Sequence, residues 1–288
     1  MTHTSLLVRV TERLEGLTIL DPVVTRVRDA VVKALPSQRV RDVLHGVPLG
    51  HPLHPALVAV PVGAFTSVAV LDALPGAAPA AATLIGLGLV GAVPAAVAGF
   101  TDWQALHEQQ QRVGFVHAAT TITALGAYAA SLAARRAGRH SRGKAWAYAG
   151  LAAVGAGGYL GGHLAYRQAA GANHVEDVPH RVEPGWHDLG EFDTLPQGRP
   201  VHRQLAGVDL VVVRSEQAAL VLAGLCSHLS GPLWQGKLID GCLTCPWHSS
   251  VFDVNNGRVV HGPATAPQPQ FDSRVREGRL EVRLPGAG

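Results

Sequence analysis

Residues 226–252 read CSHLSGPLWQGKLIDGCLTCPWHSSVF and contain two cysteine–histidine pairs. One residue separates Cys226 from His228. Sixteen residues lie between His228 and Cys245, and two residues separate Cys245 from His248. Two thiolates and two imidazoles on two loops can bind a [2Fe–2S] cluster, with the thiolates on one iron and the imidazoles on the other. The same four side chains can form a tetrahedral zinc site, so counting ligands leaves both centres open.

Three segments around these pairs resemble the Rieske family, and they favour the cluster over zinc. They are the loop 229–233, the run 241–252 and the loop 262–263. The resemblance implies a Rieske-type [2Fe–2S] cluster in which Cys226 and Cys245 bind the first iron. His228 and His248 would bind the second. It also implies an all-β domain that carries two cluster-binding loops.

Two positions after the second histidine bear on the reduction potential. Ser250 stands where high-potential relatives have a hydroxyl, and Phe252 stands where they have a tyrosine. Hydrogen bonds to the cluster sulfurs stabilise the reduced state, so the resemblance implies an intermediate potential. Ser249 replaces a glycine that the family usually has, so this loop is expected to be strained if its backbone needs a glycine-like conformation.

All three cysteines of the chain lie within twenty residues of one another, which argues against a disulfide framework. In the cytochrome bc members of the family, two further loop cysteines form a disulfide, and neither has a counterpart here. Cys242 is left over and is expected to be a buried strand residue.

The C-terminal part of the chain has the pattern of short β-strands, beginning at Trp186. The strand and hairpin signals are Val208–Val213, Ala218–Leu222, Asn255-Asn256-Gly257 and Glu277-Gly278. We predict a small antiparallel β domain over residues 186–288. A polar linker without periodicity is predicted over residues 166–185.

Four apolar segments occupy the middle of the chain, at 53–73, 81–101, 114–134 and 145–165. Each is close to the ~20 residues that a helix needs to cross a bilayer, and their many glycines and alanines allow close helix packing. The near absence of internal charge argues against the alternative, a soluble helical core. We predict a multidomain protein in which an all-α four-helix transmembrane bundle, residues 51–165, precedes the all-β domain.

Residues 1–50 are polar with helical periodicity and are predicted to form amphipathic N-terminal helices. Asp21-Pro22 marks the start of one helix, and a second runs from about Ser37 to His45, with Gly46 at its C-terminus. The first ten residues lack the apolar core and cleavage site of a signal peptide, so none is predicted.

Four crossings place both flanking segments on one side of the membrane, but the choice of side is contested. The basic loop 135–144 favours the cytoplasm for itself, which leaves the cluster domain outside. Seven basic residues before the first crossing oppose this. An external cluster domain also needs export of a folded protein, and Arg135-Arg136 is only a degenerate twin-arginine signal. We predict a multi-pass cell-membrane protein with a cytoplasmic cluster domain.

Five ionisable residues are expected near one membrane face: His51, His54, Asp102, His117 and His163. Such groups are costly at a membrane unless paired or functional, so the set suggests a b-type haem, another metal or a quinone site. Histidines at helix ends can also be simply interfacial. The segments Gly50–Ala56 and Gly99–Trp103 resemble a membrane-domain family of unknown function with four predicted helices, which implies topology over about residues 45–165 and no activity.

The leading functional hypothesis is a membrane-anchored, ferredoxin-like one-electron carrier between a donor protein and an acceptor protein or quinone. The alternative is a membrane quinol or quinone oxidoreductase, with or without haem, and a third hypothesis is a redox or iron sensor. A Rieske oxygenase needs a further mononuclear iron site, and only forty residues follow His248. No basic patch with interleaved aromatic residues suggests nucleic-acid binding.

Overall fold

The structure is a computed structural model that describes residues 6–216 and 218–285. The outer ends of the predicted segments 1–50 and 186–288 therefore lie outside the described residues. A helical half followed by a β-rich domain confirms the predicted fold class.

The chain divides into two compact units. The helical unit comprises Met1–Pro36 and Leu53–Ala170, and the β-rich unit comprises Ser37–Pro52 and Gly171–Gly288. The chain thus leaves the helical unit after Pro36 and returns to it at Leu53. The short helix between these points packs with the strands, whereas the sequence groups it with the other N-terminal helices.

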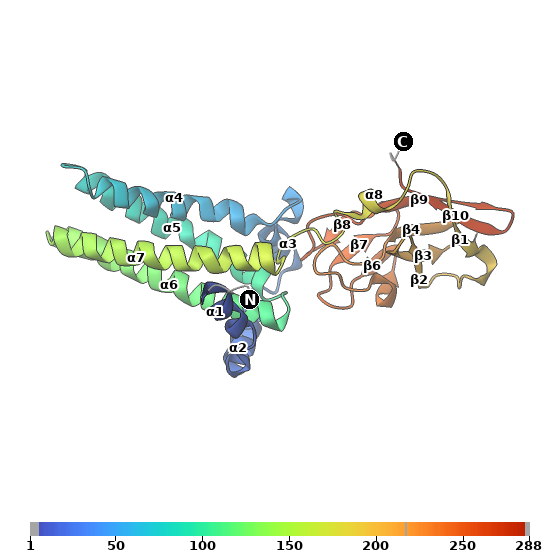
Figure 1. The fold of residues 1–288 in the computed structure, drawn as a ribbon, viewed down its shortest axis with the longest axis horizontal. Coiled ribbons are helices and arrows are strands. Elements are labelled where there is room, and N and C mark those ends of the chain that lie inside the picture. The colour runs from blue at the N-terminus through green and yellow to red at the C-terminus, as the bar shows by residue number, and fades with distance from the viewer. Residues whose placement is uncertain (1–5, 217, 286–288) are drawn as a thin grey trace, which may run out of the picture. The chain divides into compact units, whose positions relative to one another are not determined.

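The helical unit is built from two short and four long helices. They are α1 Leu6–Glu15, α2 Asp21–Ala34, α4 Leu53–Leu71, α5 Ala78–Trp103, α6 Glu108–Arg136 and α7 His140–Gly162. The helix α2 begins at Asp21 with Pro22 in its first turn, as predicted. Figure 1 shows the long helices as two hairpins, with α4 along α5 and α6 along α7.

Three of the four long helices, α4, α5 and α6, are long and apolar enough to cross a membrane. The fourth predicted crossing, 145–165, lies in α7, which is 23 residues long but is not among these spans within the described residues. Arg142 and Lys144 in its first turns and its many glycines lower its hydropathy. The predicted count of four is therefore only roughly supported.

Glycines allow the helices of the bundle to approach closely. The rings of Phe65 and Tyr128 stack with centroids 3.8 Å apart. A Cβ atom on Gly88 would lie 2.4 Å from the Phe65 ring, and one on Gly150 would lie 2.8 Å from the Tyr128 ring. These glycines make room for the aromatic pair, as expected for helices that associate through small residues.

A buried ion pair joins the two hairpins at the end where α4 and α6 finish. Arg135 donates a hydrogen bond from Nη2 to Asp72, and both side chains are at most 3% exposed. The guanidinium also donates from Nε to the Ser131 hydroxyl, and Lys144 donates to the Asp72 carbonyl oxygen. The pair compensates two charges that would be costly to bury alone.

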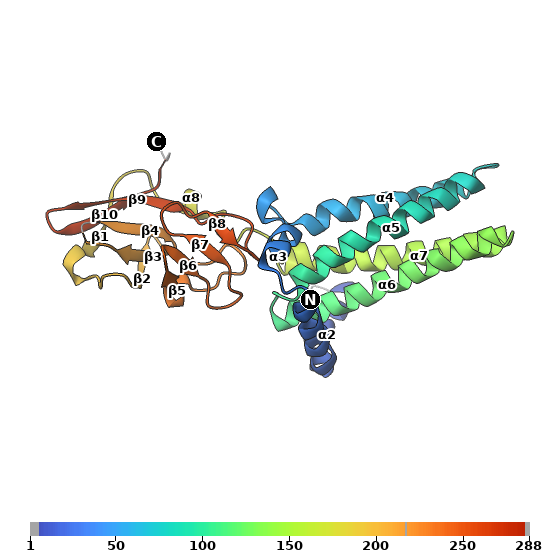
Figure 2. The same cartoon turned by 180° about the vertical axis from the view of Figure 1, so that it is seen from behind.

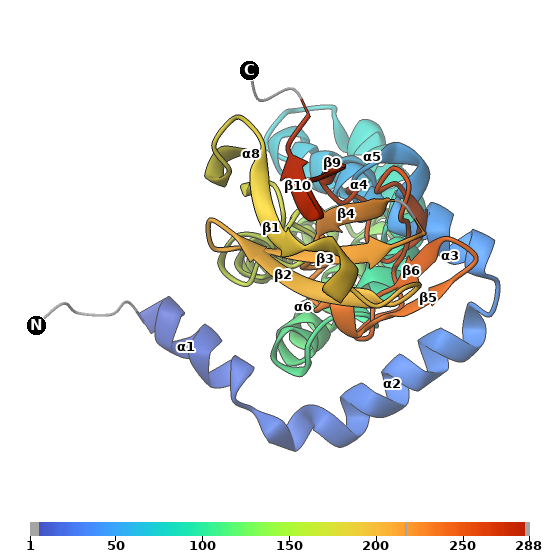
Figure 3. The ribbon, with the colours of Figure 1, turned by 90° about the vertical axis from the view of Figure 1, so that its right-hand side faces the viewer.

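The short N-terminal helices are held by a buried charge on α6. Arg112 of α6 donates two hydrogen bonds to the Asp21 carboxylate, at 2.6 and 2.9 Å, and a third to the Glu15 carbonyl oxygen. Figure 3 shows α1 and α2 meeting at an angle, where the chain passes from one helix to the next. Arg112 therefore links both helices to the bundle.

The β-rich unit contains two antiparallel sheets (Figure 2). The six-stranded sheet has the order β1-β10-β9-β4-β3-β2, from β1 His187–Glu191, β10 Arg279–Arg283, β9 Gln270–Arg276, β4 Ala219–Ala223, β3 Val208–Arg214 and β2 Pro200–Leu205. The four-stranded sheet follows the chain, with β5 Lys237–Ile239, β6 Cys242–Thr244, β7 Val251–Asp253 and β8 Val259–His261. Both predicted hairpins are confirmed, since Glu277-Gly278 joins β9 to β10 and Asn255–Gly257 lies between β7 and β8.

Part of the segment predicted as a linker is packed. Val175, Val178 and Val182 are buried in the core beneath the six-stranded sheet, and Val178 begins the short helix α8 Val178–Arg181. The three valines have the helical spacing i, i+3, i+7, but the helix is only four residues long and the residues between them are polar or proline, so the signal is weak.

The buried pair in the bundle can be tested by removing one charge. We expect Asp72→Ala to lower the free energy of unfolding in detergent by about 3–5 kcal/mol, because Arg135 is left buried without its counter-charge. Adding Arg135→Leu should recover part of the loss. Asp29→Ala, which breaks an exposed pair with Arg28, serves as the control and should change little. Equal effects of Asp72→Ala and Asp29→Ala would contradict this account.

Candidate metal centre

The two cysteine–histidine pairs lie on two loops of the β-rich unit. The first loop, 226–233, follows β4, and the second, 245–250, connects β6 to β7. The loops are tied at their bases, because the Cys226 N–H donates to the Gly231 carbonyl and the Cys245 N–H donates to the Ser250 carbonyl, each at 2.8 Å. Two closed loops thus present the four side chains to one another.

The two thiols are buried against each other. Cys226 is 1% exposed and Cys245 is 2% exposed. The hydrogen bond that Cys226 donates to Cys245 lowers the pKa of Cys245, and main-chain N–H groups of Trp247 and His248 lower it further. The same contact with Cys245, together with burial, raises the pKa of Cys226. Two thiols in one apolar pocket cannot both ionise cheaply without a positive charge between them.

The two histidines complete the arrangement with a buried nitrogen that a metal could use. The imidazoles of His228 and His248 lie edge to face, with centroids 5.2 Å apart. Nδ1 of His228 is buried and makes no hydrogen bond within the described residues. Burying such an atom is unfavourable unless it binds something, so the residues fit a metal group at this position.

The four side chains form a pair of thiols and a pair of imidazoles. Two irons joined by sulfides place the thiolates and the imidazoles apart, so the arrangement fits the two-iron cluster.

The side chain of Ser250 links the first thiol to a third loop. Its hydroxyl donates to the sulfur of Cys226 and accepts a hydrogen bond from the Ala264 N–H at 3.0 Å. Ser250 is fully buried, as is Phe252, which lies in the same apolar cluster as both cysteines. Because a hydroxyl has one proton, accepting from Ala264 leaves that proton for the sulfur.

The third loop is held in turn by the short helix α3 Gln38–His45. Asp42 accepts hydrogen bonds from the Gly262 N–H at 3.0 Å and from His261 Nδ1 at 2.9 Å. Burial alone would raise the pKa of Asp42, but these hydrogen bonds and one from Gln38 lower it below its usual range. A Cβ atom on Gly262 would lie 3.1 Å from His45, so the helix sits directly on this loop.

Asp42, His261 and His174 were not predicted as part of this site. The His174 N–H donates to the Ser227 carbonyl at 3.0 Å, and its Nδ1 lies 3.2 Å from the Ser230 hydroxyl oxygen. These residues are distant in sequence from the cysteine–histidine pairs and carry no spacing signal. A resemblance of the Gly262-Pro263 loop to the Rieske family was the only sequence indication of this region.

Comparison with known proteins identifies the fold of this centre. Residues 185–272 match the family model for the Rieske [2Fe-2S] domain. The chain is 30% identical over 99 residues to the anthranilate 1,2-dioxygenase ferredoxin subunit of Burkholderia cepacia, and the match covers 92% of that protein and 34% of this chain. The chain belongs to the Rieske [2Fe–2S] family. Its Rieske domain therefore has a [2Fe–2S] cluster as its cofactor.

Other relatives of the Rieske domain are parts of larger proteins. The oxygenase component of 3-ketosteroid-9-alpha-monooxygenase from Mycobacterium tuberculosis is 35% identical over 107 residues, which cover 37% of this chain but 27% of that protein. Among solved structures, the ferredoxin of carbazole 1,9a-dioxygenase from Nocardioides aromaticivorans IC177 is 26% identical, with a TM-score of 0.33, over 34% of this chain and 97% of that one. Residues 50–174 match a second family, described as a predicted membrane protein (DUF2231). The helical unit is membrane-associated.

The structure brings together only some of the predicted membrane-face residues. His54 lies close enough to His117 for its charge to act on that imidazole. Asp102 lies in the last turn of α5, at the end of the bundle where α4 begins. His51 belongs to the β-rich unit, where its Nδ1 lies 3.1 Å from the Pro52 carbonyl oxygen.

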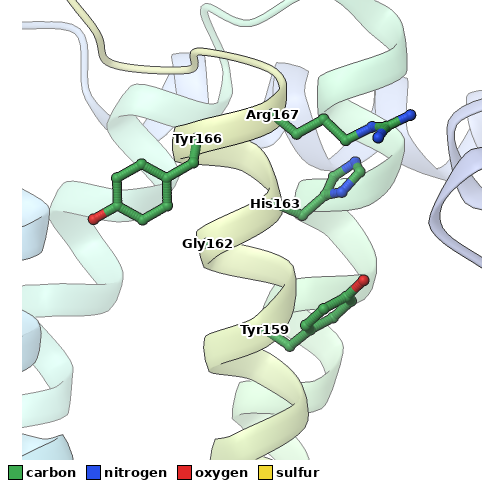
Figure 4. A pocket seen from close by; sticks show the side chains of 5 residues that line it. All are labelled: Tyr159, Gly162, His163, Tyr166 and Arg167. Atoms are coloured by element: carbon green, nitrogen blue, oxygen red, sulfur yellow. The ribbon is translucent and has the colours of Figure 1, made fainter. Parts of the chain in front are cut away.

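His163 pairs with a residue of an N-terminal helix. Its Nε2 lies 2.8 Å from Glu15 Oε1 of α1, and Arg167 pairs with Glu12 on the same helix. Figure 4 shows His163 and Arg167 pointing to one side of the chain and Tyr166 to the other, beside an open pocket lined by these three residues, Tyr159 and Gly162. His163 thus has a structural partner of its own.

The second Rieske loop contains the expected backbone strain. Ser249 has φ of +62°, the left-handed region that glycine adopts most easily. We expect Ser249→Gly to raise the free energy of unfolding of the Rieske domain by about 1 kcal/mol. Chemical denaturation of the full chain, followed by loss of the cluster absorbance, would measure this.

The control for this substitution is Ser37→Gly. Ser37 is also an exposed serine, but its φ is −76° and its side chain makes no capping hydrogen bond. Glycine there relieves no strain, so stability should stay unchanged or fall. A gain at Ser37 equal to that at Ser249 would show that strain is not the cause.

Proposed function

We propose that this protein is a membrane-anchored Rieske iron–sulfur protein that carries single electrons, in the manner of a ferredoxin. Cys226 and Cys245 would hold the first iron, and His228 and His248 the second. The observation that carries the proposal is the pair of buried thiols on two closed loops, with the imidazoles of His228 and His248 edge to face beside them. The ferredoxin subunit matched over nearly its whole length supports the same function.

The residues around the cluster provide a shielded interior and one accessible edge. When bound, the [2Fe–2S] group supplies reversible one-electron chemistry. Cys226, Cys245 and Phe252 are buried and exclude water from the thiolate side. His248 is half-buried and Trp247 is 50% exposed, so a redox partner could approach the histidine side.

Main-chain and hydroxyl donors prepare the site for the added negative charge of the reduced state. The N–H groups of His228, Trp247 and His248 point at the two sulfurs, as does the Ser250 hydroxyl. Such donors are fixed before the electron arrives, so little reorganisation is needed. This arrangement favours a carrier that cycles between two charge states with small structural change.

The partners we propose are an electron donor protein and a membrane acceptor, either a protein or a quinone. The relatives that carry the same domain are ferredoxin and oxygenase components, which supports exchange with other redox proteins. We propose that the Rieske domain faces the cytoplasm, because an external domain would need export of a folded protein and the chain has only a degenerate signal for it.

Electron paramagnetic resonance of the dithionite-reduced, detergent-purified full chain tests the proposed ligands. The wild type should show a Rieske-type signal, and Cys226→Ser and His228→Ala should abolish it. Cys242→Ser is the matched control, because Cys242 lies in β6 outside both loops and should leave the signal intact. An iron-loaded wild type without the signal, or a signal that survives Cys226→Ser and His228→Ala, would overturn the proposal.

The hydroxyl of Ser250 and the absence of a hydroxyl at Phe252 should influence the reduction potential of the cluster. A hydrogen bond to a charged group contributes about 1.5 kcal/mol, which for one electron is about 60 mV. We expect Ser250→Ala to lower the potential by about this amount and Phe252→Tyr to raise it. Redox titration with Ser249→Gly as the control in the same loop measures both. An unchanged potential in Ser250→Ala would exclude the role assigned to its hydroxyl.

A further inference from the structure

Two histidines lie at the same level on two parallel helices of the bundle. The helices α4 and α6 run in the same direction and lie diagonally, since each packs against α5 and α7. Their side chains meet at the stacked rings of Phe65 and Tyr128. His54 and His117 each precede these aromatic residues by eleven positions, which is about three helical turns or 16 Å. They therefore occupy the same face and the same level on both helices.

Each histidine is oriented by an identical contact with the neighbouring helix. Nδ1 of His54 bonds the Ala95 carbonyl oxygen of α5 at 2.8 Å, and Nδ1 of His117 bonds the Gly157 carbonyl oxygen of α7 at 2.8 Å. A carbonyl oxygen only accepts, so Nδ1 carries the proton in both rings. Nε2 then presents a lone pair, which is the arrangement found for metal-binding imidazoles.

Neither Nε2 atom makes a hydrogen bond within the described residues. Both side chains are half-buried, so each lone pair is accessible to a ligand. The two imidazoles are also within range of an electrostatic interaction with each other.

The helices beside the two histidines present small residues to them. On α5, Ala95 and Ala98 are buried at the level of His54. Both histidines are half-buried. The small residues Gly99 and Gly161 lie beside His54 and His117, and any Cβ atom on Gly99 would lie 2.8 Å from the His54 ring.

The composition of the site selects among the ligands that two imidazoles can bind. A bare metal ion needs further protein ligands, and no group of three His, Cys, Asp or Glu converges within the described residues. A quinone needs hydrogen-bond donors for its oxygens, whereas both N–H groups are already used and Nε2 only accepts. A quinol can donate to Nε2 but gives no Soret band, so the optical spectrum distinguishes it from haem. A haem supplies four ligands of its own and needs only two axial imidazoles.

We propose that His54 and His117 are the two axial ligands of a b-type haem bound between α4 and α6. His163 and His51 are not part of this site, since His163 pairs with Glu15 and His51 belongs to the β-rich unit. The haem would be a second one-electron centre in the same chain. The proposal concerns the membrane unit and does not depend on how the cysteine–histidine loops bind iron.

The test uses the full chain expressed with a haem precursor and purified in detergent. The wild type should contain one b-type haem per chain by the pyridine haemochrome assay, with a low-spin ferric resonance typical of two imidazoles. His54→Ala and His117→Ala should each lose most of this haem and keep the Rieske resonance, which shows that the protein is folded. His163→Ala is the matched control and should retain haem.

Two further variants distinguish the loss of a haem ligand from misfolding of the bundle. His117→Met should still bind haem but with a shifted spectrum and a higher potential, because methionine is a weaker donor to ferric iron. His117→Gly should regain the Soret band when imidazole is added. A wild type that shows the Rieske resonance but neither contains haem nor binds added hemin would overturn the proposal. Unchanged haem content in both alanine variants would also overturn it.

Discussion

The contact between two buried thiols is the interaction on which the β-rich unit depends. Cys226 and Cys245 come from loops nineteen positions apart in sequence, and each sulfur is surrounded by main-chain N–H donors from its own loop. Such a pocket is unfavourable for two thiolates until positive charge is placed between them. Iron bound between the thiolates would remove this cost, as expected when metal binding is coupled to folding.

Contacts that hold this pocket extend well beyond the two loops. Asp42 of α3 holds the loop that begins at Gly262, and that loop donates from Ala264 to Ser250, which in turn donates to Cys226. This series of hydrogen bonds explains why residues 37–52 belong to the β-rich unit although they lie before the first long helix. The helix α3 is thus a structural part of the redox domain.

The helical unit contains polar side chains among apolar helices, and several of the charged ones are paired. Asp72 and Arg135 neutralise each other at one end, and Arg112 binds the Asp21 carboxylate at the other. His54 and His117 remain between these ends with their N–H groups bonded and their second nitrogens without hydrogen bonds. The charged groups of these pairs have structural partners, whereas the second nitrogen of each imidazole is open to a ligand.

The sequence by itself determined the features that depend on local spacing. The Cys-x-His and Cys-x-x-His pairs, the hairpin signal at Glu277-Gly278 and the long apolar segments each follow from neighbours within one element, and the structure places each in the expected element. The strain at Ser249 was also expected, because the Rieske family usually has glycine at this position and the serine adopts positive φ.

Only the tertiary structure decided which distant residues meet. The ion pair of Asp72 with Arg135 joins residues 63 positions apart, and the contact of Asp42 with Gly262 joins residues 220 positions apart, so neither leaves a periodic signal. The same holds for the five ionisable membrane residues, which the sequence placed at one face without distinguishing them. Packing distinguished them, because Glu15 binds His163 while backbone carbonyls of α5 and α7 accept the N–H groups of His54 and His117.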